Sequence, residues 1–235
     1  MFHKQCCTIY GNDMKVDVGS HIIFLYKKES ELKDVLFNYT YEGVNNNDLC
    51  ILIVSDPGIV ESLKNEIKNR RISKEVIDKL ITTLKVSDFY LEGGKFEKER
   101  TLKKLDKLIE ENPAVRIRVA GQAEWADCTI FDEWHQYETE VTERYCDKNI
   151  ILLCAYDLNR LDFENIIKLI QSHMLILYKD GSKWKISETV ERKIYEQKID
   201  ELENVTKHSV DRELRMVELK QTIDRLKKEL DEYKK

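Results

Sequence analysis

The chain has 235 residues, a formal net charge of −5 and a hydrophobic fraction of 42%. This length allows one sizeable core with an appendage, and the acidic balance argues against a nucleic-acid surface, because neutralising phosphates requires an excess of Lys and Arg. The sequence shows neither an apolar run of about 20 residues nor a signal-peptide core, so we expect a cytoplasmic protein without a membrane span.

Apolar runs alternate with amphipathic segments in the first half of the chain, after an expected tail over 1–18. Helices are predicted where apolar residues recur at a period near 3.6, and strands where short apolar runs stand between polar turns. The elements predicted here are strands at 22–26, 49–54 and 84–90, and helices at 31–45, 59–84 (one or two) and 96–111.

The second half continues the same alternation. Asp162 is a plausible N-cap, and Asp180-Gly181 is typical of a tight hairpin turn. Repeated strand–helix–strand order predicts an α/β protein with a mainly parallel sheet flanked by helices. The elements predicted here are strands at 115–120 and 150–156, helices at 129–145 and 162–172, and a closing hairpin of 174–178 with 184–186.

The turn after the first strand stands where a P-loop ATPase carries its phosphate-binding glycines. Here it reads Lys27-Lys28-Glu29-Ser30, without a glycine, and side chains block the backbone approach that phosphate needs. The strand at 115–120 runs into Gly121 rather than a metal-positioning Asp. We therefore expect binding without turnover, and no enzymatic activity.

The segment 188–235 contains no Gly or Pro and is rich in charge. Its apolar residues are spaced by three and four positions, an average of about 3.5 that favours a coiled coil over a lone helix. We expect a helical segment for signalling or dimerisation, and a homodimer; the alternative is a helix that packs on its own domain. The apolar positions are Met216, Leu219, Ile223, Leu226, Leu230 and Tyr233.

Seven short motifs occur in order within 19–187. They are GSHIIFLY at 19–26, YEGVNNNDLC at 41–50, YLEGGKF at 90–96, RVAGQAEW at 118–125, YE at 137–138, LCAY at 153–156 and SH at 172–173. Together they resemble the methanogen/methylotroph DcmR sensory domain, abbreviated MEDS, a degenerate relative of the RecA/KaiC ATPases that lacks the P-loop. The resemblance implies a sensory input module for small organic ligands such as hydrocarbon derivatives, common in methanogens, which works with a histidine kinase or another signalling partner.

Ligands of open α/β sheets bind at the carboxyl ends of the strands, so the residues at these ends are the candidates for ligand binding. Several are aromatic and would form an apolar pocket with hydroxyl and indole donors, or would instead cap the core. Asp56 would cap the next helix or line the same pocket. The candidates at or near strand ends are Tyr26, Asp56, Tyr90, Gln122, Trp125 and Tyr156.

Three further candidates are polar residues in apolar surroundings. His21 and His173 could bind a soft metal together with Cys50 or Cys154, but no close Cys or His pair supports this, so we expect structural histidines, reduced thiols and no metal or cofactor. Arg118 lies within an apolar strand and needs a partner. Glu138 or Glu124 could form a structural ion pair with it; the alternative is an anchor for an anionic ligand.

Three functions fit these observations. The first is a cytoplasmic sensory module that relays ligand occupancy through its C-terminal helix. The second is a cryptic nucleotide-binding protein or ATPase of the RecA/KaiC type. The third is a pure protein–protein adaptor that the coiled coil dimerises.

Overall fold

A computed structural model describes residues 6–11, 14–126, 130–190, 192–193, 207, 212–213, 215–223 and 225–226. The chain divides into two units, 1–192 and 193–235.

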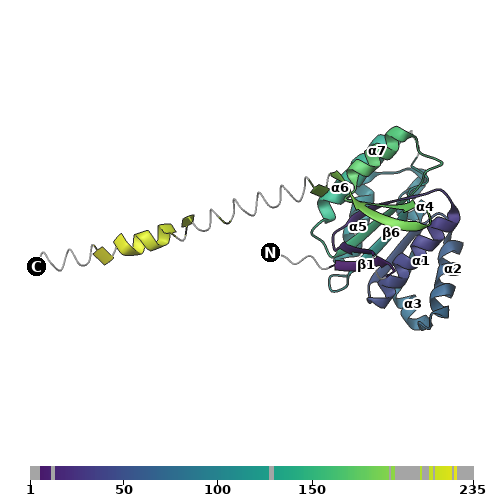
Figure 1. The fold of residues 1–235 in the computed structure, drawn as a ribbon, viewed down its shortest axis with the longest axis horizontal. Helices are drawn as coiled ribbons and strands as arrows, with labels where there is room; N and C mark the ends of the chain where they lie inside the picture. Colours follow the sequence, from purple (N-terminus) through teal and green to yellow (C-terminus); the bar gives the residue numbers. More distant parts are fainter. Residues whose placement is uncertain are drawn as a thin grey trace, which may run out of the picture. The chain divides into compact units, whose positions relative to one another are not determined.

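The first unit is built on a seven-stranded sheet in the order β5-β4-β6-β7-β3-β8-β9 (Figure 1). All neighbouring strands are parallel except β8 and β9, which form the predicted antiparallel hairpin. The predicted mainly parallel α/β fold is therefore confirmed. The strands are β3 (His21–Tyr26), β4 (Leu49–Val54), β5 (Ile81–Lys85), β6 (Ile117–Gln122), β7 (Ile150–Asp157), β8 (Leu175–Asp180) and β9 (Lys183–Glu188).

Helices cover both faces of the sheet, which explains why every residue of β3 and β6 is buried (Figure 1). Alternate side chains of one strand enter two separate cores: Phe24 packs on the α1 side and Ile23 on the α6 side. The first face carries α1 (Glu29–Asn45), α2 (Pro57–Asn69) and α3 (Lys74–Leu80); the second carries α4 (Val86–Phe89), a short turn η1 (Glu92–Gly94), α5 (Lys98–Glu110), α6 (Phe131–Tyr145) and α7 (Phe163–Ser172).

The N-terminal residues form a hairpin, so the predicted tail over 1–18 is wrong for its described part. Strands β1 (Cys6–Tyr10) and β2 (Met14–Asp17) pair antiparallel in a sheet of their own. Period-two alternation places Cys7, Ile9, Met14 and Val16 on one buried face, which joins the α1-side core. This hairpin therefore belongs to the folded domain.

The predicted segment 59–84 is two helices, and the chain passes between them through Arg71 at a φ of 69°. Ser73 caps α3 by accepting a hydrogen bond from the Val76 backbone N–H. Strand β5 consequently starts earlier than predicted and ends at Lys85, where α4 begins. Tyr90 follows this short helix, so the prediction that it ends a strand is wrong.

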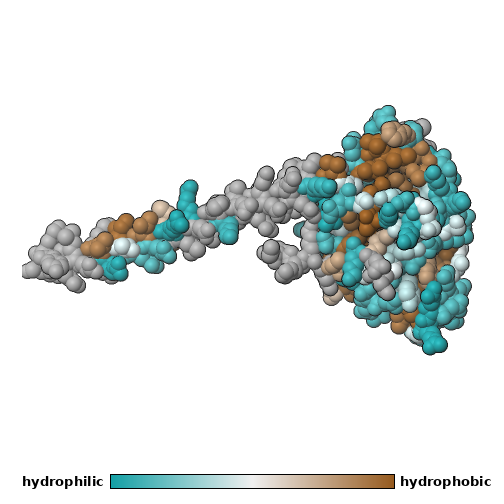
Figure 2. All heavy atoms as spheres, viewed as in Figure 1, coloured by the Kyte–Doolittle hydropathy of each residue, from teal (hydrophilic) through white to brown (hydrophobic). Residues whose placement is uncertain are grey.

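In the second unit, residues 215–223 are helical. The apolar side chains are exposed, from 49% at Ile223 to 58% at Leu219, and Figure 2 shows hydrophobic residues gathered along one side of this segment. Leu230 and Tyr233 lie outside the described residues. The coiled coil stays a prediction.

Among the described residues, none of the helices combines the length and the apolar character needed to cross a membrane.

Candidate functional site

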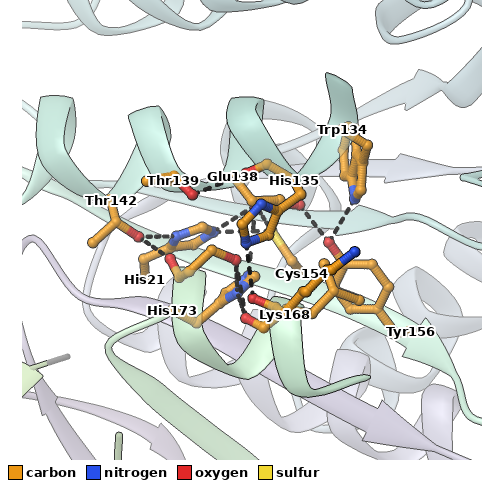
Figure 3. A network of polar contacts seen from close by, with 12 residues as sticks. His21, Trp134, His135, Glu138, Thr139, Thr142, Cys154, Tyr156, Lys168 and His173 are labelled. Atoms are coloured by element: carbon orange, nitrogen blue, oxygen red, sulfur yellow. Dashed lines mark hydrogen bonds and ion pairs between the residues drawn. The ribbon is translucent and has the colours of Figure 1, made fainter. Parts of the chain in front are cut away.

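Four potential metal-ligating side chains converge in the core on the α6 side of the sheet (Figure 3). They are His21, Glu138, Cys154 and His173, here called the His–Glu–Cys cluster. All four are buried, and one ligand atom from each lies within 4.8 Å of the others. The cluster joins residues that are far apart in the sequence, because β3, β7, α6 and the end of α7 meet at this point.

The sheet and two helices fix the positions of these side chains. Ile23 is the neighbour of Cys154 in the parallel β3–β7 pair, and His21 lies two residues earlier on the same face. On α6, Glu138 shares the buried face with Trp134 and Val141, at the spacing that places residues on one side of a helix. His173 is the C-cap of α7.

Hydrogen bonds on the outer side set the tautomer of both imidazoles. Thr142 Oγ1 donates to the Ser172 carbonyl (2.5 Å) and therefore accepts from His21 Nδ1 (2.7 Å). His173 Nδ1 lies 2.6 Å from the Leu169 carbonyl, which can only accept. Each ring thus carries its hydrogen on Nδ1 and directs the Nε2 lone pair into the cluster.

The inward contacts centre on one carboxylate oxygen. Glu138 Oε2 lies 3.1 Å from His21 Nε2 and 3.5 Å from His173 Nε2. Cys154 Sγ lies 3.2 Å from His21 Nε2 and 3.6 Å from the same carboxylate oxygen. His173 Nε2 has no hydrogen-bond partner among the described residues, although it is buried.

The other carboxylate oxygen is held from the aromatic side. Tyr156 donates to Glu138 Oε1 (2.5 Å), and Trp134 Nε1 donates in turn to the Tyr156 hydroxyl (2.8 Å). These bonds fix the rotation of the carboxylate and leave Oε2 facing the two imidazoles.

Burial favours the neutral form of every group in the cluster. Desolvation lowers the pKa of both His21 and His173 to about 3. It raises the pKa of the Glu138 carboxyl, and it raises the pKa of the Cys154 thiol well above its ordinary value. Without a further charge, each group in the cluster is therefore held in its uncharged form.

The aromatic candidates lie mostly in the core. Tyr90 is 4% and Tyr156 1% exposed, while Trp125 is partly buried with its ring 5.2 Å from that of Tyr90. A cavity of about 10 Å³ lies beside Tyr90, Tyr137 and Cys154, with room for roughly one water molecule. In this structure the rings therefore pack in the core, beside a cavity too small for an organic ligand.

Two other candidates meet at the carboxyl ends of the strands. Gln122 Oε1 accepts from the Ser55 backbone N–H (3.0 Å), which links β6 to the end of β4. Tyr26 is buried, which raises the pKa of its hydroxyl to about 12, and a hydrogen bond with Gln122 opposes this shift in part. Asp56 caps α2 by accepting from Gly58 N (2.8 Å), so its capping role is confirmed.

Arg118 lies apart from the other candidates, near the start of β6 and on the α1 side of the sheet. Its ion pair is confirmed, but the predicted partners Glu138 and Glu124 are wrong: Nε contacts Asp48 Oδ2 at 2.6 Å. Asp48 precedes β4 and lies beside the start of β6 because these strands are parallel neighbours. An anchor for an anionic ligand at the strand ends is therefore not the role of Arg118.

The turn between β3 and α1 offers a carboxylate where a P-loop would bind phosphate. Glu31 Oε2 accepts from the backbone N–H groups of Lys27 (2.9 Å) and Lys28 (3.2 Å). Lys179 Nζ lies 3.2 Å from the other oxygen of Glu31. Two backbone N–H groups of this turn are therefore already bonded to a carboxylate of the protein itself, which also places a negative charge where phosphate would bind.

Glu138 was not predicted as a member of this site, whereas both histidines and Cys154 were considered as metal ligands from the sequence. A signal was present: in the helix predicted at 129–145, Glu138 falls on the same face as Trp134 and Val141. A carboxylate on a buried helix face requires a partner, and here the partners are imidazole nitrogens.

The fold resembles that of a solved KaiC-like protein. A KaiC-like protein from the hyperthermophilic archaeon Pyrococcus horikoshii OT3 aligns over 80% of this chain and 89% of its own, with a TM-score of 0.52 and 10% identity. A second protein of that organism aligns over 74% and 88%, with a TM-score of 0.46 and 10% identity. Among curated proteins, no sequence match is found.

The family model of the methanogen/methylotroph, DcmR sensory domain matches residues 20–174, which is well over half of the chain. The KaiC-like fold agrees with the relationship that the sequence motifs imply. The chain therefore belongs to the MEDS family, and its role is sensory.

Proposed function

We propose that the chain is a cytoplasmic, non-enzymatic sensory module that binds a small organic ligand and passes its occupancy through the C-terminal segment. The receiving partner is a histidine kinase or another signalling protein. Membership of a sensory family supports the role. One observation supports the transmission of ligand occupancy to the C-terminal segment. The residues that lead into the second unit along the chain are hydrogen-bonded to the backbone of the His–Glu–Cys cluster.

This connection runs through Thr189. Its hydroxyl donates to the His173 carbonyl (2.5 Å), and its backbone N–H donates to the Met174 carbonyl (3.0 Å). Three residues later Arg192 Nη2 pairs with Asp17 Oδ2 of the N-terminal hairpin at 2.8 Å. A displacement of His173 would therefore move the last residues of the first unit. The unit would then have two conformations, and a ligand that binds one of them more tightly shifts the equilibrium between them.

Aromatic rings provide the binding surface for the ligand. Phe96, Trp125 and Trp134 pack with ring centroids 4.7–5.4 Å apart. Because the neighbouring cavity has only about 10 Å³, a molecule larger than water has to displace a ring. Trp125 is the partly exposed member and the one best able to move. Binding would thus be coupled to rearrangement.

Thermal shift assays test this binding. Purified protein is screened against short-chain alcohols, amines, thiols and halides, and native mass spectrometry searches for a co-purified molecule. We expect at least one class to raise the melting temperature of the wild type, and to do so less in Trp125→Ala. Lys68→Ala, a change in the last turn of α2, is the matched control. No shift with any class, or an equal shift in Trp125→Ala, would contradict the proposal.

Nucleotide binding is the second candidate, since the fold is KaiC-like. The Glu31 carboxylate argues against it, because it accepts from two backbone N–H groups of the turn and would repel phosphate. Titration with ATP and Mg²⁺ is expected to show no binding and no turnover in the wild type. Tight binding would replace the organic-ligand proposal.

We also propose that the protein is a homodimer through the apolar stripe of the second unit. Met216, Leu219, Ile223 and Leu226 are exposed, and burying such side chains stabilises association by roughly 1.5–3 kcal/mol each when burial is complete. The double variant Ile223→Asp with Leu226→Asp should be monomeric in light scattering while its first unit stays folded. A dimeric double variant would show that association uses another surface. A protein that dimerises but shows no response to any ligand would instead be a pure protein–protein adaptor.

A further inference from the structure

We propose that the His–Glu–Cys cluster is a binding site for one divalent transition-metal ion of borderline softness, with Zn²⁺ the best match. The ligand atoms are His21 Nε2, His173 Nε2, Cys154 Sγ and one oxygen of Glu138. This inference stands on side-chain geometry and does not depend on the organic ligand proposed above.

The donor set and its spacing fit such an ion. Two imidazoles, a thiolate and a carboxylate are zinc ligands, whereas Mg²⁺ and Ca²⁺ prefer oxygen alone. Zinc–ligand bonds of about 2.0–2.3 Å place the corners of a tetrahedron roughly 3.3–3.7 Å apart. Four of the separations in the cluster are 3.1, 3.2, 3.5 and 3.6 Å, and none exceeds 4.8 Å.

The surrounding contacts are those that orient metal ligands. Metal-binding histidines donate their second ring N–H to an oxygen, and both do so here: His21 to the Thr142 hydroxyl and His173 to the Leu169 carbonyl. Tyr156 holds the non-coordinating oxygen of Glu138. These bonds prevent either ring from turning its lone pair away.

A purely structural polar core leaves one contact unexplained. His173 Nε2 is fully buried, carries a lone pair and has no hydrogen-bond donor among the described residues. Buried polar atoms without a partner are uncommon in folded proteins, since each costs free energy. A cation at the centre of the cluster satisfies this lone pair together with that of His21.

Charge balance favours the same conclusion. A divalent ion bound by one carboxylate, one thiolate and two neutral imidazoles gives a site with no net charge, which suits a buried location. Coordination breaks the S–H bond of Cys154 and the O–H bond of Glu138, and both protons leave to solvent. No electron is transferred, and the ion stays divalent.

Burial of all four ligands means that the ion enters while the chain folds or opens locally. The full chain is therefore unfolded in guanidinium with a chelator and refolded with one equivalent of Co²⁺ or Zn²⁺. We expect one ion per chain, a higher melting temperature, and for Co²⁺ the intense visible bands of a tetrahedral site with a thiolate charge-transfer band. No binding, or Co²⁺ binding without the thiolate band, would overturn the proposal.

Variants assign the ligands. Cys154→Ser should abolish the thiolate band, and His173→Gln and Glu138→Gln should each weaken Co²⁺ binding at least about tenfold. His135→Gln and Cys146→Ser, which change the same residue types outside the cluster, should bind like the wild type. Full affinity in Cys154→Ser, or loss of affinity in the two controls, would place the metal elsewhere. Where a ligand variant does not fold, the wild-type Co²⁺ spectrum and zinc X-ray absorption decide between sulfur-containing and sulfur-free ligation.

Discussion

Two groups of buried polar side chains lie on opposite faces of the same sheet. They differ in whether their polar atoms pair with neighbouring elements or point toward a common centre. On the α1 side, Arg118 and Arg116 contact the two oxygens of Asp48, and Arg118 Nη1 donates to the Thr8 carbonyl. These contacts join β6, β4 and the N-terminal hairpin. On the α6 side, the His–Glu–Cys cluster turns its lone pairs toward a common centre.

The difference separates a structural cluster from a candidate site. Within the part of the chain that the structure describes, Arg118 Nη2 has no hydrogen-bond partner, but the guanidinium lies 5.4 Å from the centre of the Tyr39 ring, which stabilises a cation. In the His–Glu–Cys cluster the atom without a partner among the described residues is His173 Nε2, whose lone pair faces three other metal-ligating atoms, an arrangement that a cation stabilises. Burial alone therefore does not identify a binding site. What identifies one is that polar atoms without a partner point toward a common centre.

The largest expected effect comes from Asp48→Asn. It removes a buried carboxylate and leaves Arg118, which is fully buried, without its counter-charge. Breaking such a pair costs on the order of 3–5 kcal/mol of unfolding free energy. Urea denaturation measures the loss. Glu29→Gln, which breaks an exposed pair with Lys33, should change stability by no more than about 0.5 kcal/mol.

A similar loss in Asp48→Asn and Glu29→Gln would show that the α1-side cluster does not stabilise the fold. The metal affinity of Asp48→Asn, measured below its melting temperature, should equal that of the wild type. A lower affinity would mean that the two faces of the sheet are coupled.

Gly121→Ala is expected to have the next largest effect. A methyl group at this position would overlap the Tyr90 hydroxyl, which approaches the β6 backbone. Overpacking of this kind costs typically 1–3 kcal/mol. Tyr90→Phe removes the hydroxyl, so the double variant should recover most of the loss in denaturant unfolding. Equal losses in the single and the double variant would place the strain elsewhere on the α6 side.

The smallest effect is predicted for Thr189→Val, which keeps the size of the side chain but removes its bond to the His173 carbonyl. A hydrogen bond of this kind contributes roughly 0.5–1.5 kcal/mol. Amide exchange at 188–193 should become faster, and it should stay unchanged in Thr189→Ser. Unchanged exchange in Thr189→Val would remove the support for a relay through this residue.

The sequence predicted the sheet better than the site. Period-two and 3.6-residue patterns report which face of an element is buried, and this information was enough to locate β3, β4 and β7. The repeated strand–helix–strand succession predicted that the sheet is mainly parallel, but not the order of its strands. The pattern also showed that Arg118 needs a partner, but not that Asp48 is the partner. That choice depends on the register of β4 against β6, which no local pattern contains.

The same limit explains the His–Glu–Cys cluster. His21 and His173 meet because α7 ends beside β3, where Met174 N donates to the His21 carbonyl. Their ring centroids are 4.0 Å apart, yet the residues stand near opposite ends of the domain sequence. The wrong N-terminal tail has a different cause: the alternation of Cys7 and Ile9 is too short to be distinguished from chance before the partner strand is known.

The position of β3 has a consequence for biosynthesis. This strand lies between β7 and β8, so both of its neighbours leave the ribosome more than a hundred residues after it does. Until then an apolar segment, His21–Tyr26, has no strand to pair with. Such delayed pairing slows folding and leaves nascent chains open to aggregation. A translation pause or a chaperone that protects this segment would therefore favour folding over aggregation.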